Sequence, residues 1–182
     1  MIFTRTPLAG AWVVDPEPHR DERGSFSRAF DVEEFGAHGL ETRVVQANVS
    51  VSARAGTLRG LHYQTAPHEE TKLVRCVRGA IYDVVVDLRE GSATYLRWFA
   101  VELEPRAGRM LYVPPAFAHG FQTLTDDTEV HYQVSHEHAP SHERGVRFDD
   151  PVLAIHWPEA KRIISQRDRE LPWTGARRGP AL

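Results

Sequence analysis

The sequence predicts an all-β fold, a sandwich or barrel of short strands with a few short helices. Its apolar residues fall into short runs with strand-like alternation, and turn residues separate many of these runs. We expect strands at residues 11–14, 44–51, 72–77, 81–88, 97–104, 110–113 and 129–134. Because Gly and Pro occur as single turn signals and no repeat or linker interrupts the pattern, residues 1–182 are expected to form a single domain.

Helical signals are few. Asp31 can cap a helix over residues 31–35, and the acidic residues that follow it suit the positive end of a helix dipole. Gly36 then ends this helix. A second short helix is expected near residues 158–162.

Composition excludes several classes of protein. The chain has 182 residues and a formal net charge of −3, with 41% hydrophobic and 26% charged residues, which argues against disorder. No apolar run reaches the ~18 residues of a membrane-spanning helix, so we expect no membrane association. The slightly acidic balance argues against nucleic-acid binding. A lone cysteine, Cys76, lies in an apolar run and is expected to be buried; with no secretory signal in sight, a cytoplasmic protein is predicted.

Polar residues interrupt the apolar faces of three predicted strands. Lys72, Asp83, Asp87 and Tyr132 each lie two residues from an apolar side chain and so share its face. Inward charges cost free energy unless they are paired or border a cavity. The pattern therefore favours a barrel with a ligand cavity over a dry core. The alternative is that some strands are two-sided and these groups face solvent.

Histidines raise the question of a metal site. Four of them cluster in the sequence, with Glu137 and Glu143 nearby: His131, His136, His138 and His142. The Pro and serines of residues 135–143 indicate a loop, so a chance surface cluster is the favoured interpretation. Metal-binding barrels of the cupin type use a His-x-His pair, whereas here Gln64 follows His62 at that spacing, which disfavours a metal.

General acid–base chemistry fits better than nucleophilic catalysis, because the chain has neither a nucleophile elbow nor a Gly-rich phosphate loop. His62 can take a proton near neutral pH. Tyr132, if inward, can deliver one from another direction, and Lys72 can stabilise an oxyanion. Taken alone, His62 and Tyr132 are each better explained as structural residues. Only the combination of all three favours catalysis, and spacing does not show that they converge.

Six ordered motifs provide a more specific signal. They occupy residues 19–24, 46–50, 58–64, 83–89, 113–121 and 165–168, and include Leu58-Arg59-Gly60-Leu61-His62-Tyr63-Gln64 and Ser165-Gln166-Arg167-Asp168. Over about residues 7–173 the chain resembles the dTDP-4-dehydrorhamnose 3,5-epimerase family. The resemblance implies a cupin-like β jelly roll without metal or other cofactor. It also implies a homodimer with exchanged N-terminal strands and a nucleoside-diphosphate 4-keto-6-deoxyhexose substrate, with dTDP-4-dehydro-6-deoxyglucose as the expected one.

The resemblance also implies roles for individual residues. His62 matches the base that removes a proton from carbon, Asp168 the carboxylate that orients it, and Lys72 the enolate-stabilising cation. Tyr132 matches the acid that returns the proton on the opposite face. Arg23 and Arg59 match diphosphate contacts, Arg23 from across the dimer. His119 matches a histidine near the sugar. The remaining matches are the pocket-lining positions Gln46 and Asn48 and, on the cavity wall, Asp83.

Two positions depart from the family pattern. Arg28 stands where a nucleobase-binding Glu is common, and His138 where a Tyr packs against the sugar. The nucleobase, the sugar and the number of inverted centres therefore stay open. The alternatives are a relative that inverts one centre or uses another nucleotide, a non-catalytic sugar-nucleotide-binding cupin, and a metal-dependent cupin oxygenase, which Gln64 disfavours. Retention of both an acid and a base favours catalysis, since binding alone needs neither.

Overall fold

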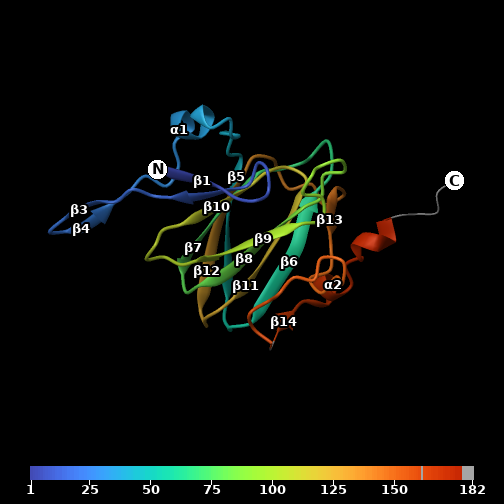
Figure 1. The fold of residues 1–182 in the computed structure, drawn as a ribbon. Coiled ribbons are helices and arrows are strands. Elements are labelled where there is room, and N and C mark those ends of the chain that lie inside the picture. The colour runs from blue at the N-terminus through green and yellow to red at the C-terminus, as the bar shows by residue number, and fades with distance from the viewer. Residues whose placement is uncertain (161, 178–182) are drawn as a thin grey trace.

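The computed structural model describes residues 1–160 and 162–177, and antiparallel strands dominate it (Figure 1). One sheet has six strands in the order β1 (Ile2–Arg5), β2 (Trp12–Asp15), β10 (Met110–Val113), β7 (Lys72–Arg78), β12 (Thr128–Val134) and β5 (Gln46–Ser52). The second has the order β13 (Glu143–Gly145), β6 (Thr57–Gln64), β11 (Phe117–Thr123), β8 (Ile81–Asp87) and β9 (Trp98–Leu103), with β14 (Ile163–Ile164) parallel to β6. The predicted all-β architecture is confirmed.

The two sheets pack face to face around the main core. Val74 and Val130 of the first sheet lie in one buried cluster with Val85 and Phe121 of the second. Cys76 belongs to the same cluster, as expected, and burial raises the pKa of its thiol to about 11. These contacts make the fold a sandwich whose inner faces supply the hydrophobic core.

Both sheets are also covered on their outer faces. Residues 146–157 pack on the outer side of the second sheet, where Val84 and Val86 are fully buried. Strand β8 is therefore buried on both faces, in keeping with its run of three consecutive valines. On the first sheet the helix α1 (Val32–Ala37) buries Phe35 against Met110. The segment after residue 157 then returns to β6, which brings the end of the described chain beside the second sheet.

The helix predictions had different outcomes. Helix α1 is present, and the side chain of Asp31 accepts hydrogen bonds from the backbone of Glu33 and Glu34. The expected helix near residues 158–162 is wrong for its described part; residue 161 lies outside the described residues. Gln122 pins this segment in a non-helical form, since its amide donates to the Glu159 carbonyl and accepts from the Glu159 N–H, each at 3.0 Å. Helical structure follows this segment in α2 (Gln166–Arg169) and the 3₁₀ turn η1 (Thr174–Arg177).

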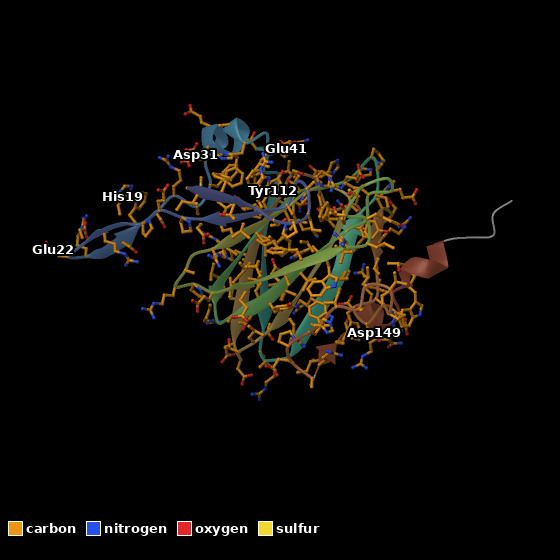
Figure 2. The ribbon with its side chains drawn as sticks, viewed as in Figure 1. His19, Glu22, Asp31, Glu41, Tyr112 and Asp149 are labelled. Atoms are coloured by element: carbon orange, nitrogen blue, oxygen red, sulfur yellow. The ribbon has the colours of Figure 1, made fainter. Side chains whose placement is uncertain are left out.

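A hairpin of β3 (His19–Asp21) and β4 (Gly24–Phe26) projects from the sandwich (Figure 1). Every residue of both strands is exposed, and Phe26 keeps 74% of its surface accessible. Figure 2 shows Glu22 at the outer end of this hairpin and His19 nearer the sandwich. Within the described residues, no helix is both long and apolar enough to cross a membrane.

Candidate active site

A cavity with two lobes opens between the two sheets. The lobes share three wall residues, His62, Lys72 and Tyr132. The larger lobe, about 490 Å³, is also lined by Arg59, His119, Arg167 and Asp168. The smaller one, about 300 Å³, is also lined by Gln46, Asn48, Gln64, Glu70, His138 and Glu143. The three residues that sequence spacing alone could not bring together therefore meet where the lobes join.

His62 lies on β6 and is held from behind by Asp168. Its Nε2 is 2.8 Å from Oδ1 of Asp168, while Oδ2 of the same carboxylate accepts the Gly60 N–H at 3.2 Å. Burial by itself would raise the pKa of Asp168, but the hydrogen bonds from His62 and Gly60 outweigh it and hold this pKa below its usual value. The carboxylate thus stays ionised and leaves Nδ1 of His62 for a group in the cavity.

The position of Asp168 follows from a short helix. Ser165 caps the N-terminus of α2, and its Oγ accepts the Asp168 N–H at 3.1 Å. Strand β14, immediately before this cap, pairs with β6 and so ties the helix to the strand that carries His62. The pattern Ser-x-x-Asp therefore builds the turn that presents the carboxylate to the imidazole.

Tyr132 and Lys72 face His62 from the opposite sheet. They lie on the paired strands β12 and β7, where Tyr132 is opposite Val74 and Val134 is opposite Lys72. The two functional side chains are thus diagonal neighbours on one face. Burial, and then the carboxylate of Glu70, raises the pKa of Tyr132, so its phenol is neutral at neutral pH.

His119 lines the larger lobe, but its partner does not. Nε2 of His119 is 2.7 Å from Oδ1 of Asp83, which is completely buried behind it and absent from the cavity lining. Asp83 is thus an inward residue, as its strand position indicates, that contacts the imidazole and not the open cavity. Asp87 is also fully buried, but it accepts hydrogen bonds from Arg89, Ser92 and Thr94 and so stabilises a loop.

The expected sugar and diphosphate contacts within this chain do reach the cavity. Arg59 lines the larger lobe, held at the sheet edge by the Val51 carbonyl at 3.2 Å. Gln46 and Asn48 alternate along β5 and line the smaller lobe. Oε1 of Gln46 accepts the backbone N–H of His138 at 2.7 Å, which fixes the loop that brings His138 to the same lobe.

Two expected substrate contacts lie away from this cavity. The Arg23 side chain, 84% exposed on the projecting hairpin, forms an ion pair with Asp21. Arg28 pairs with Asp31 at 3.1 Å and with Glu34 at 3.6 Å, beside α1. Neither arginine lines the cavity of its own chain. The contact expected of Arg23 is with the cavity of a partner chain, so it stays a prediction.

Two ion pairs at the cavity were not expected from the sequence: a carboxylate partner for Lys72, and a pair between β13 and α2. Glu70 is 3.1 Å from the Lys72 ammonium, and Glu143 of β13 is 2.7 Å from Arg167 of α2. Burial by itself would raise the pKa of Glu143. The hydrogen bond and the charge of the Arg167 guanidinium outweigh burial and lower this pKa, so the carboxylate is ionised. The available signals were positional, since Glu70 lies two residues before Lys72 and Arg167 is next to Asp168.

The histidines that cluster in the sequence do not form one group in the structure. His136 and His142 pack against His68, with ring centroids 4.9 and 4.4 Å apart, whereas His138 lies at the cavity. In the part of the chain that the structure describes, no group of three or more His, Cys, Asp or Glu side chains is arranged to hold a metal ion.

Gln64, at the position where a metal-binding cupin would have its second histidine, is engaged on both sides of its amide. Its Nε2 donates to the carbonyls of His68 at 2.8 Å and Glu137 at 3.2 Å, and its Oε1 accepts the Ala139 N–H at 2.6 Å. The side chain therefore joins the loops that follow β6 and β12.

The chain is similar to known proteins in both sequence and fold. The sequence model described as dTDP-4-dehydrorhamnose 3,5-epimerase matches residues 5–174. The enzyme of that name from Sinorhizobium fredii is 42% identical over 173 residues, which are 94% of this chain and 89% of the relative.

Solved structures agree in fold over nearly the whole chain. The Bacillus anthracis dTDP-4-dehydrorhamnose 3,5-epimerase, crystallised with TDP and PPi bound, superposes with a TM-score of 0.91 and 41% identity, covering 94% of this chain and 98% of that one. A 3'-monoepimerase from Streptomyces bikiniensis in complex with dTDP-quinovose gives a TM-score of 0.86 and 39% identity, covering 92% and 85%.

Proposed function

The chain belongs to the dTDP-4-dehydrorhamnose 3,5-epimerase family and has its cupin-like β-sandwich fold, and from this we propose that it inverts C3, C5 or both in a nucleoside-diphosphate 4-keto-6-deoxyhexose. The preferred substrate is dTDP-4-dehydro-6-deoxyglucose. One observation supports this most strongly: the His62–Asp168 pair and Tyr132 lie on opposite walls of one cavity. Inversion through a planar intermediate needs a base and an acid on opposite faces.

The proposed mechanism starts at a carbon next to the C4 ketone, which acidifies its proton. Nδ1 of His62 takes that proton, and the electrons of the C–H bond move to the C4 oxygen. The Lys72 ammonium stabilises the resulting enolate oxygen. Tyr132 then gives its phenol proton to the opposite face of the carbon, the ketone re-forms, and the centre is inverted. His62 then releases its proton to solvent, and the Tyr132 phenolate takes up a proton from solvent.

The reaction is redox-neutral, and both proton transfers use side chains of this cavity. An enolate is too basic to form freely at neutral pH, so the base must be held near the carbon and a cation near the oxygen. His62 and Lys72 lie on facing sheets and border both lobes, so one can act at the carbon as a base while the other stabilises the oxygen.

Arg59 supports the assignment of a diphosphate to the larger lobe. A guanidinium binds phosphate oxygens through paired N–H donors. Beside it are His119 and the junction residues, while the smaller lobe offers Gln46, Asn48 and His138 to the hydroxyls of the sugar. The nucleotide would then extend from the larger lobe toward solvent.

We propose further that the protein acts as a cytoplasmic homodimer with exchanged N-terminal strands. The exposed hairpin of β3 and β4 supports this, because it carries Arg23 and an exposed Phe26 away from its own sandwich. In such a dimer the hairpin would bring Arg23 to the diphosphate, and the β4-proximal Arg28 to the nucleobase, in the cavity of the partner.

Solvent deuterium exchange into dTDP-4-keto-6-deoxyglucose, followed by NMR, tests the function. Deuterium at both C3 and C5 is the result expected of a 3,5-epimerase. Deuterium at one carbon selects the mono-epimerase, an alternative favoured by the likeness to the S. bikiniensis 3'-monoepimerase and by His138 in the smaller lobe. Absence of exchange with this and every other nucleotide 4-keto sugar would reject the enzyme in favour of a sugar-nucleotide-binding protein.

A further inference from the structure

Glu70 is a cavity residue to which the proposed mechanism gives no role. It lines the smaller lobe together with His62, Lys72 and Tyr132, and its side chain is only 12% exposed. A carboxylate this far removed from water costs free energy unless it is paired or hydrogen-bonded. Its partners therefore show what it is used for.

The first partner is Lys72. Oε1 of Glu70 lies 3.1 Å from Nζ of Lys72, whose side chain is 11% exposed. Among the described residues Lys72 has no second carboxylate within ion-pair distance. A lysine side chain is long and flexible, so without this contact the ammonium could take several positions in the cavity.

The second neighbour of Glu70 is Gln64. Oε2 of Glu70 lies 3.4 Å from Nε2 of Gln64. The two N–H donors of that amide already serve closer acceptors, the His68 carbonyl at 2.8 Å and the Glu137 carbonyl at 3.2 Å, so the contact with Glu70 is the weakest of the three. The ion pair with Lys72 is therefore the main interaction of the Glu70 carboxylate.

From this arrangement we infer that Glu70 is a positioning residue of the epimerase reaction, whose carboxylate fixes the Lys72 ammonium beside Tyr132 at the junction of the two lobes. The inference rests on the proposed function. Glu70 holds one side of the ammonium, and the remaining N–H donors of Lys72 serve the C4 oxygen as negative charge develops there.

The charge of Glu70 also acts on Tyr132. Burial raises the pKa of this phenol first, the carboxylate of Glu70 raises it further, Arg59 lowers it and Glu143 raises it slightly. Lys72, paired with Glu70, is the other cation at the junction. A proton donor must enter the reaction protonated, so removing the charge of Glu70 should cause Tyr132 to ionise at lower pH.

The test is Glu70→Gln, with Glu69→Gln as the matched control because Glu69 is the exposed neighbour and does not line the cavity. Loss of positioning should lower kcat about tenfold while KM changes by less than about threefold. The alkaline limb of the kcat–pH profile should move to lower pH, because the Glu70 carboxylate helps to raise the pKa of Tyr132. Glu69→Gln should match the wild type in all three.

A second variant separates charge from position. Glu70→Asp keeps the charge but is one methylene shorter, so kcat should fall while the alkaline limb stays where it is in the wild type. Wild-type kcat in either variant overturns the inference, and so does a slow Glu70→Gln enzyme whose alkaline limb has not moved. An inactive wild-type chain would instead reject the proposed function itself.

Discussion

At the scale of single residues, Asp168 decides what His62 can do. Its carboxylate occupies one ring nitrogen and therefore fixes which nitrogen meets the substrate. Replacing it by Asn keeps the shape but removes the charge that stabilises the protonated ring. Asp168→Asn should lower kcat by roughly 10²–10⁴-fold, as in other carboxylate–histidine pairs.

Asp168 should also leave a mark on acid unfolding. Because its pKa in the folded protein is below the unfolded value of about 3.9, it stabilises the fold above that pH. This contribution is lost as the pH falls through the lower, folded-state pKa. The difference in Tm between wild type and Asp168→Asn should therefore shrink between about pH 5 and pH 2. Parallel Tm–pH curves would contradict this view of the carboxylate.

His62 and Tyr132 should fail in different ways. His62→Ala removes the base and should abolish deuterium exchange, a loss of roughly 10³-fold or more. Tyr132→Phe leaves proton removal possible, so exchange should continue while inversion is strongly impaired. His131→Ala, on the neighbouring position of β12 and outside both lobes, is the control and should keep both. Wild-type exchange in His62→Ala would show that another group is the base.

At the scale of secondary structure, the cap of α2 links stability to catalysis. Ser165→Ala removes the acceptor of the Asp168 N–H and should cost about 1 kcal/mol, or about 2–4 °C in Tm. Since the same turn presents Asp168 to His62, kcat should fall as well. Asp31→Ala removes the equivalent cap of α1, away from the cavity, and should cost similar stability with kcat unchanged. Equal kcat in the two variants would mean that the cap does not position Asp168.

The strands that could be predicted from the sequence are those in which polar and apolar residues alternate regularly or apolar residues form a run. β10 has the expected ends, and β8 differs by one residue. β6 and β11, which carry His62 and His119, were not among the predicted strands because polar residues and glycines break their patterns. Those glycines are structural, since a Cβ at Gly60 would lie 2.7 Å from Cα of Gly120.

The site was less predictable from physical patterns than the fold. Lys72 and Tyr132 could be placed inward because they follow the alternation of their strands. His62 and Asp168 are 106 residues apart, and only the pairing of β14 with β6 brings them together. Family resemblance supplied that link. Glu70 lies just before the predicted strand that carries Lys72, so its role required the three-dimensional contacts.

At the scale of the whole molecule, the hairpin is the feature that one chain does not explain. It extends into solvent and carries an exposed aromatic residue, Phe26, at its base, and an isolated two-stranded ribbon gains little stability from its own contacts. Docking on a second copy would bury it. In a two-fold dimer each hairpin would meet the other chain in the same way.

This arrangement predicts complementation between two defective chains. Arg23→Ala and His62→Ala should each be weakly active or inactive as homodimers. In a mixed dimer, the cavity of the Arg23→Ala chain keeps its own His62 and receives Arg23 from the partner, so one intact cavity forms. Unfolding and refolding the two variants together should therefore restore about a quarter of the wild-type activity, since half the dimers are mixed and each has one intact cavity. The controls are each variant refolded alone. If the mixture is no more active than these controls, Arg23 does not act across a dimer, and the diphosphate must be bound by Arg59 and other residues of the same chain.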